Sequence, residues 1–109
     1  MKKKVFMVDD NPELLELFKE ILESEDVEVF TYENHLQAVA DAKKENPDIL
    51  LLDAQLNGVS GLDVVHQFDP QLKKILCSGS YFKNVPEGFN GVLVKPFSIE
   101  EFKTIIKSA

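Results

Sequence analysis

Short runs of apolar residues alternate along this chain with segments in which apolar residues recur at helical spacing. Five strands are predicted, by the apolar runs Val5–Val8, Val27–Tyr32, Ile49–Leu52, Ile75–Cys77 and Val92–Val94. Ile49–Leu52 is the most apolar run, as expected for a central strand that is buried on both faces. Val27–Tyr32 alternates between apolar and polar side chains, which predicts a strand with one partly exposed face.

Four segments show the spacing of helices. The first opens with Asn11 as N-cap and Pro12 at the first helical position. The others run from about Asn34 to Lys44 before Pro47, through Leu62, Val65 and Phe68 after a loop with Gly58 and Gly61, and from a capping box at Ser98–Glu101 through Ile99, Phe102, Ile105 and Ile106. Residues 79–91 contain Gly, Pro and Asn without a helical period, so we expect a loop there.

Alternation of strands and helices indicates an α/β fold with a parallel sheet between two layers of helices. Right-handed crossover connections bring the C-terminal ends of all the strands to one edge of that sheet. In open sheets of this kind the functional site lies at that edge. The residues directly after each strand are therefore the candidates for a functional site.

The composition is that of an ordinary soluble protein, and its length of 109 residues favours one domain spanning residues 1–109. The net charge is −7 and no residue is arginine, which argues against direct binding of nucleic acid. Cys77 is the only cysteine, so no internal disulfide forms. The longest apolar run is too short to span a membrane. The lysines at 2–4 have the charge of a signal peptide, but the apolar stretch after them stops at Asp9 and Asp10, so we expect no signal peptide. We expect a cytoplasmic location.

Polar residues follow four of the five strands: Asp9 and Asp10, then Asp53, then Ser78, then Lys95. Carboxylates brought this close together repel one another unless they take up protons or a cation. Such a set of oxygen ligands suits Mg²⁺. Asp53, at the centre of the sheet, can then act as a nucleophile toward a phosphoryl group, with Lys95 and Ser78 contacting the phosphoryl oxygens.

Each of these residues also has a simpler interpretation when it is taken alone. The two aspartates at 9 and 10 can form a charged turn before the first helix. Asp53 can cap a turn, and Ser78 and Lys95 can belong to ordinary loops. The prediction of a functional site therefore depends on their arrival, in order, at the same edge of the sheet.

With these residues in this order, the chain resembles the receiver domain of two-component response regulators over nearly its whole length. The resemblance implies a flavodoxin-like fold with strand order 2-1-3-4-5. It rests on the segments Val8-Asp9-Asp10-Asn11, Leu51-Leu52-Asp53, Asn57 to Gly61, Cys77-Ser78-Gly79 and Val94-Lys95-Pro96-Phe97.

By this resemblance Asp53 is the phosphoacceptor, and Asp9 and Asp10 position Mg²⁺ with the backbone carbonyl of Gln55 as a further ligand. Ser78 takes the place of the switch hydroxyl. Lys95 takes the place of the family's lysine, which contacts the phosphoryl group and is followed here by a cis bond to Pro96. Such a domain accepts its phosphoryl group from a sensor histidine kinase or a histidine phosphotransfer protein, and its only enzymatic activities are this self-phosphorylation and slow autodephosphorylation. It signals through a downstream protein or a fused effector, without contacting nucleic acid or membrane directly.

Two features depart from the family's pattern. Val92 stands where the family usually has Tyr or Phe, so signalling through an aromatic switch is in doubt. The segment between Ser78 and Lys95 is also shorter than in typical members, which predicts that the fourth helix is reduced or absent. The Ser-Gly-Ser-Tyr sequence at 78–81 and the short connector resemble receivers attached to hybrid sensor kinases more than those of DNA-binding regulators.

Three other functions are compatible with parts of the pattern. One is a protein-interaction module on the same fold that works without phosphorylation. Another is a flavin-binding flavodoxin-like protein, although the acidic turn at Asp9 and Asp10 repels the phosphate that such a loop must hold. The third is a phosphatase with an aspartyl nucleophile, which needs a second acid at the position of Gln55.

Several other residues are interpreted as structural. His35 and His66 are expected at the surface, and Cys77 is expected to be buried within a strand. Phe82 and Phe89 either hold the irregular connector against the core or form an exposed patch for a partner. Lys2–Lys4 is expected to be a solvated start. Much of the negative charge lies on the first helix and the segment after it, where a basic partner surface is expected to dock.

Overall fold

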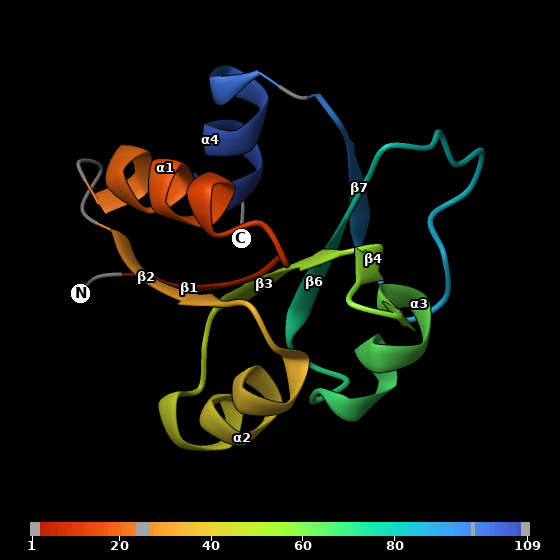
Figure 1. The fold of residues 1–109 in the computed structure, drawn as a ribbon, viewed down its shortest axis with the longest axis horizontal. Coiled ribbons are helices and arrows are strands. Elements are labelled where there is room, and N and C mark those ends of the chain that lie inside the picture. The colour runs from red at the N-terminus through yellow and green to blue at the C-terminus, as the bar shows by residue number, and fades with distance from the viewer. Residues whose placement is uncertain (1–2, 24–26, 97, 108–109) are drawn as a thin grey trace.

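The computed structural model describes residues 3–23, 27–96 and 98–107. Five parallel strands form one sheet in the order β2-β1-β3-β6-β7 (Figure 1). Counted along the main sheet alone this is the order 2-1-3-4-5, which confirms the prediction. The strands are β1 (Lys3–Val8), β2 (Val27–Tyr32), β3 (Ile49–Asp53), β6 (Lys73–Ser78) and β7 (Gly91–Val94).

Helices cover both faces of the sheet (Figure 1). On one face lie α1 (Pro12–Glu23) and α4 (Ile99–Lys107), and on the other lie α2 (His35–Glu45) and α3 (Gly61–Val64). A separate hydrophobic cluster fills the space between the sheet and each layer of helices. The three-layer α/β architecture predicted from the sequence is therefore confirmed.

The central strand β3 supplies both hydrophobic clusters. Ile49 and Leu51 point into the cluster beneath α1 and α4, whereas Leu50 and Leu52 point into the other. None of the four is more than 2% exposed. Because alternate residues of a strand face opposite sides of a sheet, a strand buried on both faces must be apolar throughout.

Helix α1 begins as the sequence predicts. The side-chain oxygen of Asn11 accepts hydrogen bonds from the backbone N–H groups of Glu13, at 3.1 Å, and Leu14, at 3.3 Å. These bonds satisfy two of the donors that every helix leaves open at its start. On the inner face of the helix, the ring of Phe18 packs against that of Phe102 in α4, with 4.4 Å between their centroids.

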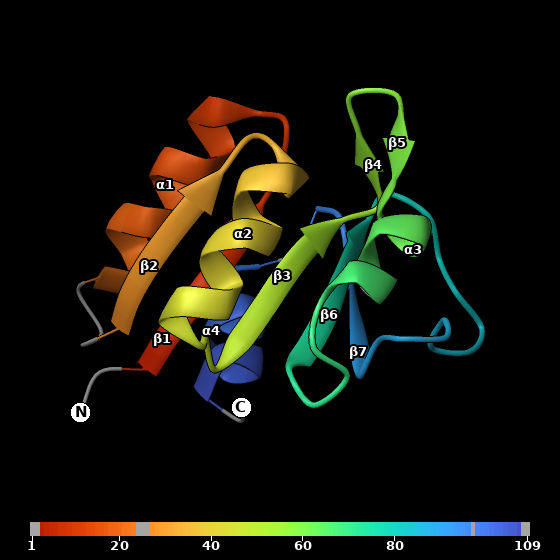
Figure 2. The same cartoon turned by 90° about the horizontal axis from the view of Figure 1, so that it is seen from below.

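The segment after β3 differs from the prediction of a loop followed by a helix through Phe68. Residues 55–60 form a small hairpin, β4 (Gln55–Leu56) and β5 (Val59–Ser60), which stands above the main sheet (Figure 2). Helix α3 then makes one turn, and a 3₁₀ turn, η1 (Val65–Gln67), ends it. Consecutive β-branched valines favour helices weakly, and Pro70 disfavours helical backbone just before it.

The connector between β6 and β7 contains no helix or strand, which confirms the expected loss of the fourth helix of the family. Phe89 is buried at 9% exposure, and Phe82 packs partly buried against the same cluster. These two rings therefore hold the connector against the core and do not form an exposed patch for a partner. Tyr81, by contrast, is 80% exposed.

The prediction of a solvated start is wrong for Lys3 and Lys4. The Lys3 ammonium donates hydrogen bonds to the carbonyl oxygens of Ile106, at 3.0 Å, and Lys107, at 3.3 Å. The Lys4 ammonium binds the backbone carbonyl and the carboxylate of Glu45, at 3.2 and 3.1 Å. The two lysines thus bind the C-terminal ends of helices on opposite faces of the sheet. Lys2 lies outside the described residues.

Helix α4 begins with the predicted capping box. The backbone N–H of Glu101 donates to the Ser98 hydroxyl at 3.0 Å, and the Ser98 N–H donates to the Glu101 carboxylate at 3.2 Å. Phe102 and Ile106 are buried, but Ile99 is 51% exposed and does not line the core as expected. Phe97, between the predicted site and this helix, lies outside the described residues. Across the described ranges, we find no helix with the length and apolar character to cross a bilayer.

Candidate functional site at the C-terminal edge of the sheet

The predicted site residues come from the C-terminal ends of four strands of the main sheet. Asp9 directly follows β1, Asp53 is the last residue of β3, Ser78 is the last residue of β6, and Lys95 directly follows β7. The strands are parallel and adjacent, so these ends lie along one edge. The fold thus brings together residues that are far apart in the sequence.

Three carboxylates form a cluster at this edge. One oxygen from each of Asp9, Asp10 and Asp53 lies within 4.8 Å of the others. Asp9 and Asp53 are 7% and 8% exposed, whereas Asp10 is exposed. The backbone N–H of Asn11 donates to the Asp9 carboxylate at 3.0 Å and so helps to fix its orientation. The group is therefore a preformed set of hard oxygen donors that is open to solvent on the side of Asp10.

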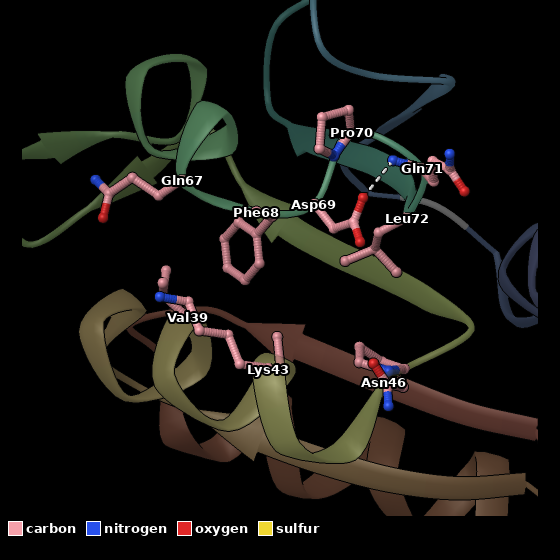
Figure 3. A pocket seen from close by; sticks show the side chains of 11 residues that line it. Val39, Lys43, Asn46, Gln67, Phe68, Asp69, Pro70, Gln71 and Leu72 are labelled. Atoms are coloured by element: carbon pink, nitrogen blue, oxygen red, sulfur yellow. Dashed lines mark hydrogen bonds between the residues drawn. The ribbon is translucent and has the colours of Figure 1, made fainter.

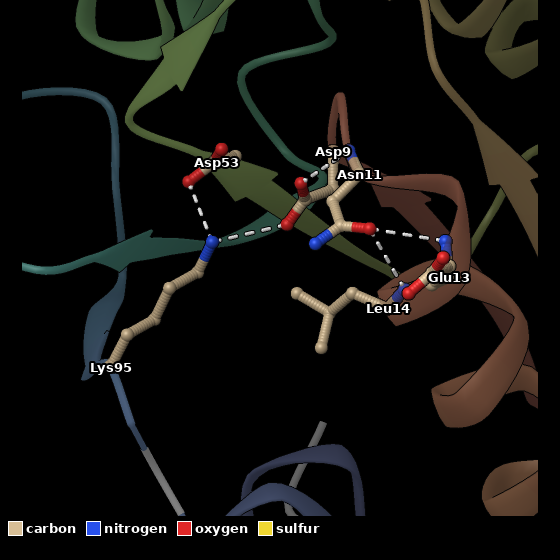
Figure 4. A network of polar contacts seen from close by, with 6 residues as sticks. All are labelled: Asp9, Asn11, Glu13, Leu14, Asp53 and Lys95. Carbon is tan, nitrogen blue, oxygen red and sulfur yellow. Dashed lines mark hydrogen bonds and ion pairs between the residues drawn. The ribbon is translucent and has the colours of Figure 1, made fainter.

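Lys95 binds two of these carboxylates at once. Its ammonium lies 3.0 Å from an oxygen of Asp53 and 3.1 Å from an oxygen of Asp9 (Figure 4). The peptide bond that follows, between Lys95 and Pro96, is cis, as predicted. The backbone N–H of Lys95 also donates to the Ser78 carbonyl at 2.7 Å, which ties the residue to the end of β6.

Burial and neighbouring charges shift the ionisation of this group. Burial raises the pKa of the Asp53 carboxyl above its ordinary value, and the nearby charges of Asp9 and Asp10 add to the rise, while Lys95 opposes it. For Lys95, burial alone lowers the pKa, but its hydrogen bonds to Asp53 and Asp9 outweigh burial and leave the pKa raised. The cluster therefore keeps a fixed cation beside the Asp53 carboxylate, whose charged form remains partly destabilised.

Ser78 is buried, at 4% exposure, at the end of β6. Its hydroxyl oxygen accepts a hydrogen bond from the backbone N–H of Ser80 at 3.0 Å, which shapes the turn that leaves the strand. Gln55 starts the hairpin, two residues after Asp53, and is exposed. The roles that the sequence assigns to the Ser78 hydroxyl and the Gln55 carbonyl stay predictions.

Two residues shape the site in ways that the sequence analysis did not anticipate. Asn11 was expected only to cap α1, yet its backbone also binds Asp9. Gly61 donates its N–H to the Ala54 carbonyl at 2.8 Å, and a β-carbon at Gly61 would overlap with the backbone carbonyl of Asp53. The sequence shows Gly61 in the segment that follows Asp53, but not the close approach across the base of the hairpin that requires glycine there.

The residues interpreted as structural lie outside the acid cluster. His66 is exposed in η1, and His35 is half-buried at the start of α2. Cys77 is buried, and this burial raises the pKa of its thiol to about 12, so the thiol is inert at neutral pH. The positions of His66 and Cys77 agree with the predictions, whereas His35, which was expected at the surface, is half-buried.

A cavity of about 750 Å³ lies at the opposite edge of the sheet, between the C-terminal half of α2 and residues 67–72 (Figure 3). It opens where α3 and η1 end early, before β6 begins. Val39, Phe68 and Leu72 form much of its apolar wall, and Lys43 extends along its rim (Figure 3). None of the acid-cluster residues contributes to it, so the two features are structurally separate.

The fold and the acidic edge define a class of small α/β proteins, and comparison with known proteins places the chain within it. The family model of the response regulator receiver domain matches residues 5–107. This chain therefore belongs to the response regulator receiver domain family of two-component systems.

Among curated proteins, the chain is 31% identical over 118 aligned positions to the polar-differentiation response regulator DivK of Brucella anthropi, covering 99% of this chain and 96% of the relative. It is 33% identical to the probable transcriptional regulatory protein TcrX of Mycobacterium tuberculosis, but spans only 45% of that protein's length. The alignment with DivK is longer than the 109 residues of this chain. DivK therefore has residues without a counterpart in this chain.

Solved structures give the same assignment. The response regulator TrrA of Thermotoga maritima, solved in complex with Mg²⁺-BeF, is 31% identical over 97% of both chains, with a TM-score of 0.84. TrrA has also been solved in complex with the histidine kinase ThkA. A receiver domain from Methylobacillus flagellatus is 25% identical with a TM-score of 0.86, covering 99% of this chain and 98% of that one.

Proposed function

We propose that this chain accepts a phosphoryl group on Asp53 from a phosphohistidine of a partner protein, in a reaction that depends on Mg²⁺. The observation that carries the proposal is the group formed by Asp9, Asp10, Asp53 and Lys95. Three carboxylates lie within 4.8 Å of one another, and one ammonium lies 3.0 Å from the central carboxylate.

The donor set fits Mg²⁺ on chemical grounds. Three carboxylates and one ammonium leave two negative charges, which a divalent cation balances. Carboxylate oxygens are the ligands that Mg²⁺ prefers, and the exposed side of Asp10 leaves room for its waters. Asp9, Asp10 and Asp53, with the carbonyl of Gln55, would hold the ion. When bound, Mg²⁺ neutralises charge on the oxygens of the transferring phosphoryl group.

The residues of the chain supply the remaining chemistry. An oxygen of Asp53 attacks the phosphorus atom of the phosphohistidine, forming a P–O bond. The P–N bond breaks, and its electron pair stays on the imidazole nitrogen, which takes up a proton from solvent. Lys95 exchanges its present contact with Asp53 for a phosphoryl oxygen, and the Ser78 hydroxyl donates a hydrogen bond to another.

Hydrolysis of the aspartyl phosphate returns the domain to its starting state, and we propose no enzymatic turnover beyond these two reactions. The partner that donates the phosphoryl group is a sensor histidine kinase or a histidine phosphotransfer protein in the cytoplasm. The complex of the relative TrrA with a histidine kinase supports this class of partner. The signal leaves through a downstream protein or a fused effector, including the hybrid-kinase arrangement that the sequence around Ser78 favours.

Mass spectrometry after incubation with acetyl phosphate and Mg²⁺ tests the proposal. We expect one phosphoryl adduct on the intact protein, lost when Asp53 is changed to Asn and retained in the matched control Asp63→Asn on the exposed start of α3. Omission of Mg²⁺ should also prevent the adduct. Absence of any adduct, or an adduct that persists in Asp53→Asn, contradicts the assignment of Asp53.

A second candidate function is a protein-interaction module that works without phosphorylation. It is favoured by the connector, which has no helix between β6 and β7, and by Val92, which occupies the place of the family's switch aromatic. This alternative predicts equal affinity for a partner protein with and without beryllofluoride and Mg²⁺. The phosphoacceptor function predicts that the two affinities differ.

A further inference from the structure

The sequence Asn-Gly-Val occurs twice in this chain, at 57–59 and at 90–92. An apolar residue precedes it each time, Leu56 in one case and Phe89 in the other, and both of these are buried. The two copies are therefore closely matched in sequence. Asparagine followed by glycine is the dipeptide most prone to spontaneous deamidation, because glycine has no side chain to shield its backbone nitrogen.

The first copy lies at the tip of the β4–β5 hairpin, which projects from the sheet (Figure 2). Asn57 and Gly58 are both exposed. No atom lies within 4 Å of the point where a β-carbon of Gly58 would be, so its α-carbon faces open space. Within the described part of the chain, no hydrogen bond holds the Asn57 side chain.

The turn that holds this copy is poorly suited to a two-residue hairpin. Gly58 has a φ of 77°, but Asn57 does not have a positive φ. The turn therefore lacks the two left-handed residues of the type I′ turn, which matches the twist of paired strands. Only two residue pairs join β4 to β5, namely Gln55 with Ser60 and Leu56 with Val59. A ladder this short opens easily.

The second copy is fixed to the sheet. The side-chain oxygen of Asn90 accepts a hydrogen bond from the backbone N–H of Lys74 at 2.8 Å. The backbone N–H of Asn90 donates to the Lys74 carbonyl at 2.7 Å. Gly91 belongs to β7, paired with Ile75. The side chain of Asn90 must therefore break contacts with β6 before it can move toward the nitrogen of Gly91.

We propose that Asn57 is a site of spontaneous deamidation in the folded protein and that Asn90 is not. The backbone nitrogen of Gly58 attacks the side-chain carbonyl carbon of Asn57, and the bond from that carbon to the amide nitrogen breaks. The amide nitrogen leaves as ammonia with the proton from Gly58, and a cyclic succinimide remains. Water then opens the ring at either carbonyl, giving aspartate or isoaspartate at position 57.

The modification changes the face of the molecule that carries the acid cluster. It adds one negative charge to the hairpin that follows Asp53, and isoaspartate also adds a methylene group to the backbone of a two-pair ladder. The base of the hairpin is held by hydrogen bonds from Ala54 to Cys77 and from Gly61 to Ala54, both at 2.8 Å. The chemical change is thus confined to the tip. The inference does not depend on the proposed phosphoryl chemistry, so either can fail alone.

Peptide mapping by mass spectrometry during incubation at mildly alkaline pH tests the proposal. In the folded protein we expect Asn57 to lose its amide at least about tenfold faster than Asn90, a ratio that corresponds to about 1.4 kcal/mol in the free energy of opening. In guanidinium chloride, where both copies are unfolded, the two rates should become similar. Enzymatic methylation of isoaspartate identifies the product, and Asn57→Gln should remove it.

The same measurements can overturn the proposal. Equal rates at the two sites in the folded protein would show that the contacts of Asn90 give no protection. No reaction at Asn57 in the folded protein, with reaction in guanidinium chloride, would show that the hairpin protects its tip. Circular dichroism of Asn57→Gln confirms that loss of the product does not reflect misfolding.

Discussion

Gly61 lies against the backbone carbonyl of Asp53 so closely that a methyl group on its α-carbon would overlap with that oxygen. Changing Gly61 to Ala must therefore displace the end of β3 or the start of α3. We expect a loss of about 1–3 kcal/mol in the free energy of unfolding, as for other overpacked sites. Gly79→Ala is the matched control, since nothing lies within 4 Å of its added carbon. Urea titration of both variants measures the difference, and equal stability would contradict the close approach.

Lys95 neutralises part of the charge of Asp9 and Asp53. Its replacement by Met should raise the affinity of the cluster for Mg²⁺ at least about threefold, because the carboxylates lose a competing cation. The rate of phosphorylation by acetyl phosphate should fall about tenfold or more, because a charge that stabilises the phosphoryl oxygens is lost.

The Lys95 experiment compares Mg²⁺ titrations and phosphorylation rates, with Lys83→Met on the exposed connector as control. Opposite changes in metal affinity and rate are the distinctive result. A parallel fall in both would instead indicate that Lys95→Met damages the whole site.

Lys3 joins the first strand to the last helix through the carbonyls of Ile106 and Lys107. Lys3→Met keeps the apolar stem and removes the charge, so it should lower the free energy of unfolding by about 1 kcal/mol. Lys19→Met, on the exposed face of α1, should leave stability nearly unchanged. Thermal unfolding of the two variants in parallel tests this prediction, and equal midpoints would show that the Lys3 contacts do not stabilise the fold.

Burial raises the pKa of the Cys77 thiol to about 12, whereas the unfolded thiol titrates near its ordinary value of 9.0. Above that ordinary value the unfolded chain loses a proton that the folded chain keeps, so stability falls as the pH rises toward 12. Between pH 8 and pH 10 the wild type should lose about 1 kcal/mol more than Cys77→Ala. Urea titrations at both pH values measure this double difference, and an equal loss in the two proteins would show that the thiol does not contribute.

Much of the fold could be predicted because it is encoded locally. The apolar runs define all five strands of the main sheet, and Asn11 and Ser98 mark the starts of two helices through their own side chains. The absence of a helical period after Ser78 correctly predicts that no helix forms before β7. The order of the parallel strands followed from the resemblance to the receiver family, and it places Asp9, Asp53 and Lys95 at one edge.

Contacts between distant segments could not be predicted in the same way. The lysines at 3 and 4 look like a solvated charged start, because their partners lie far along the chain. Leu62, Val65 and Phe68 match a helical period, yet the helix ends after one turn and a 3₁₀ turn still buries Val65 and Phe68. Apolar spacing thus predicted the burial of Val65 and Phe68, but it predicted neither the backbone that buries them nor the exposure of Leu62, which is 36%.

The hydrogen bond between Lys3 and Ile106 spans 103 residues, so it can form only late in the synthesis of this domain. On the ribosome, β1 emerges first, but the helix that its lysine binds emerges at the end of the described chain. A nascent chain that lacks α4 leaves the ammonium of Lys3 and the buried face of β1 without their final partners. Completion of the last helix thus closes one whole layer of the molecule, and a chain truncated before it should be a preferred substrate for chaperones and proteases.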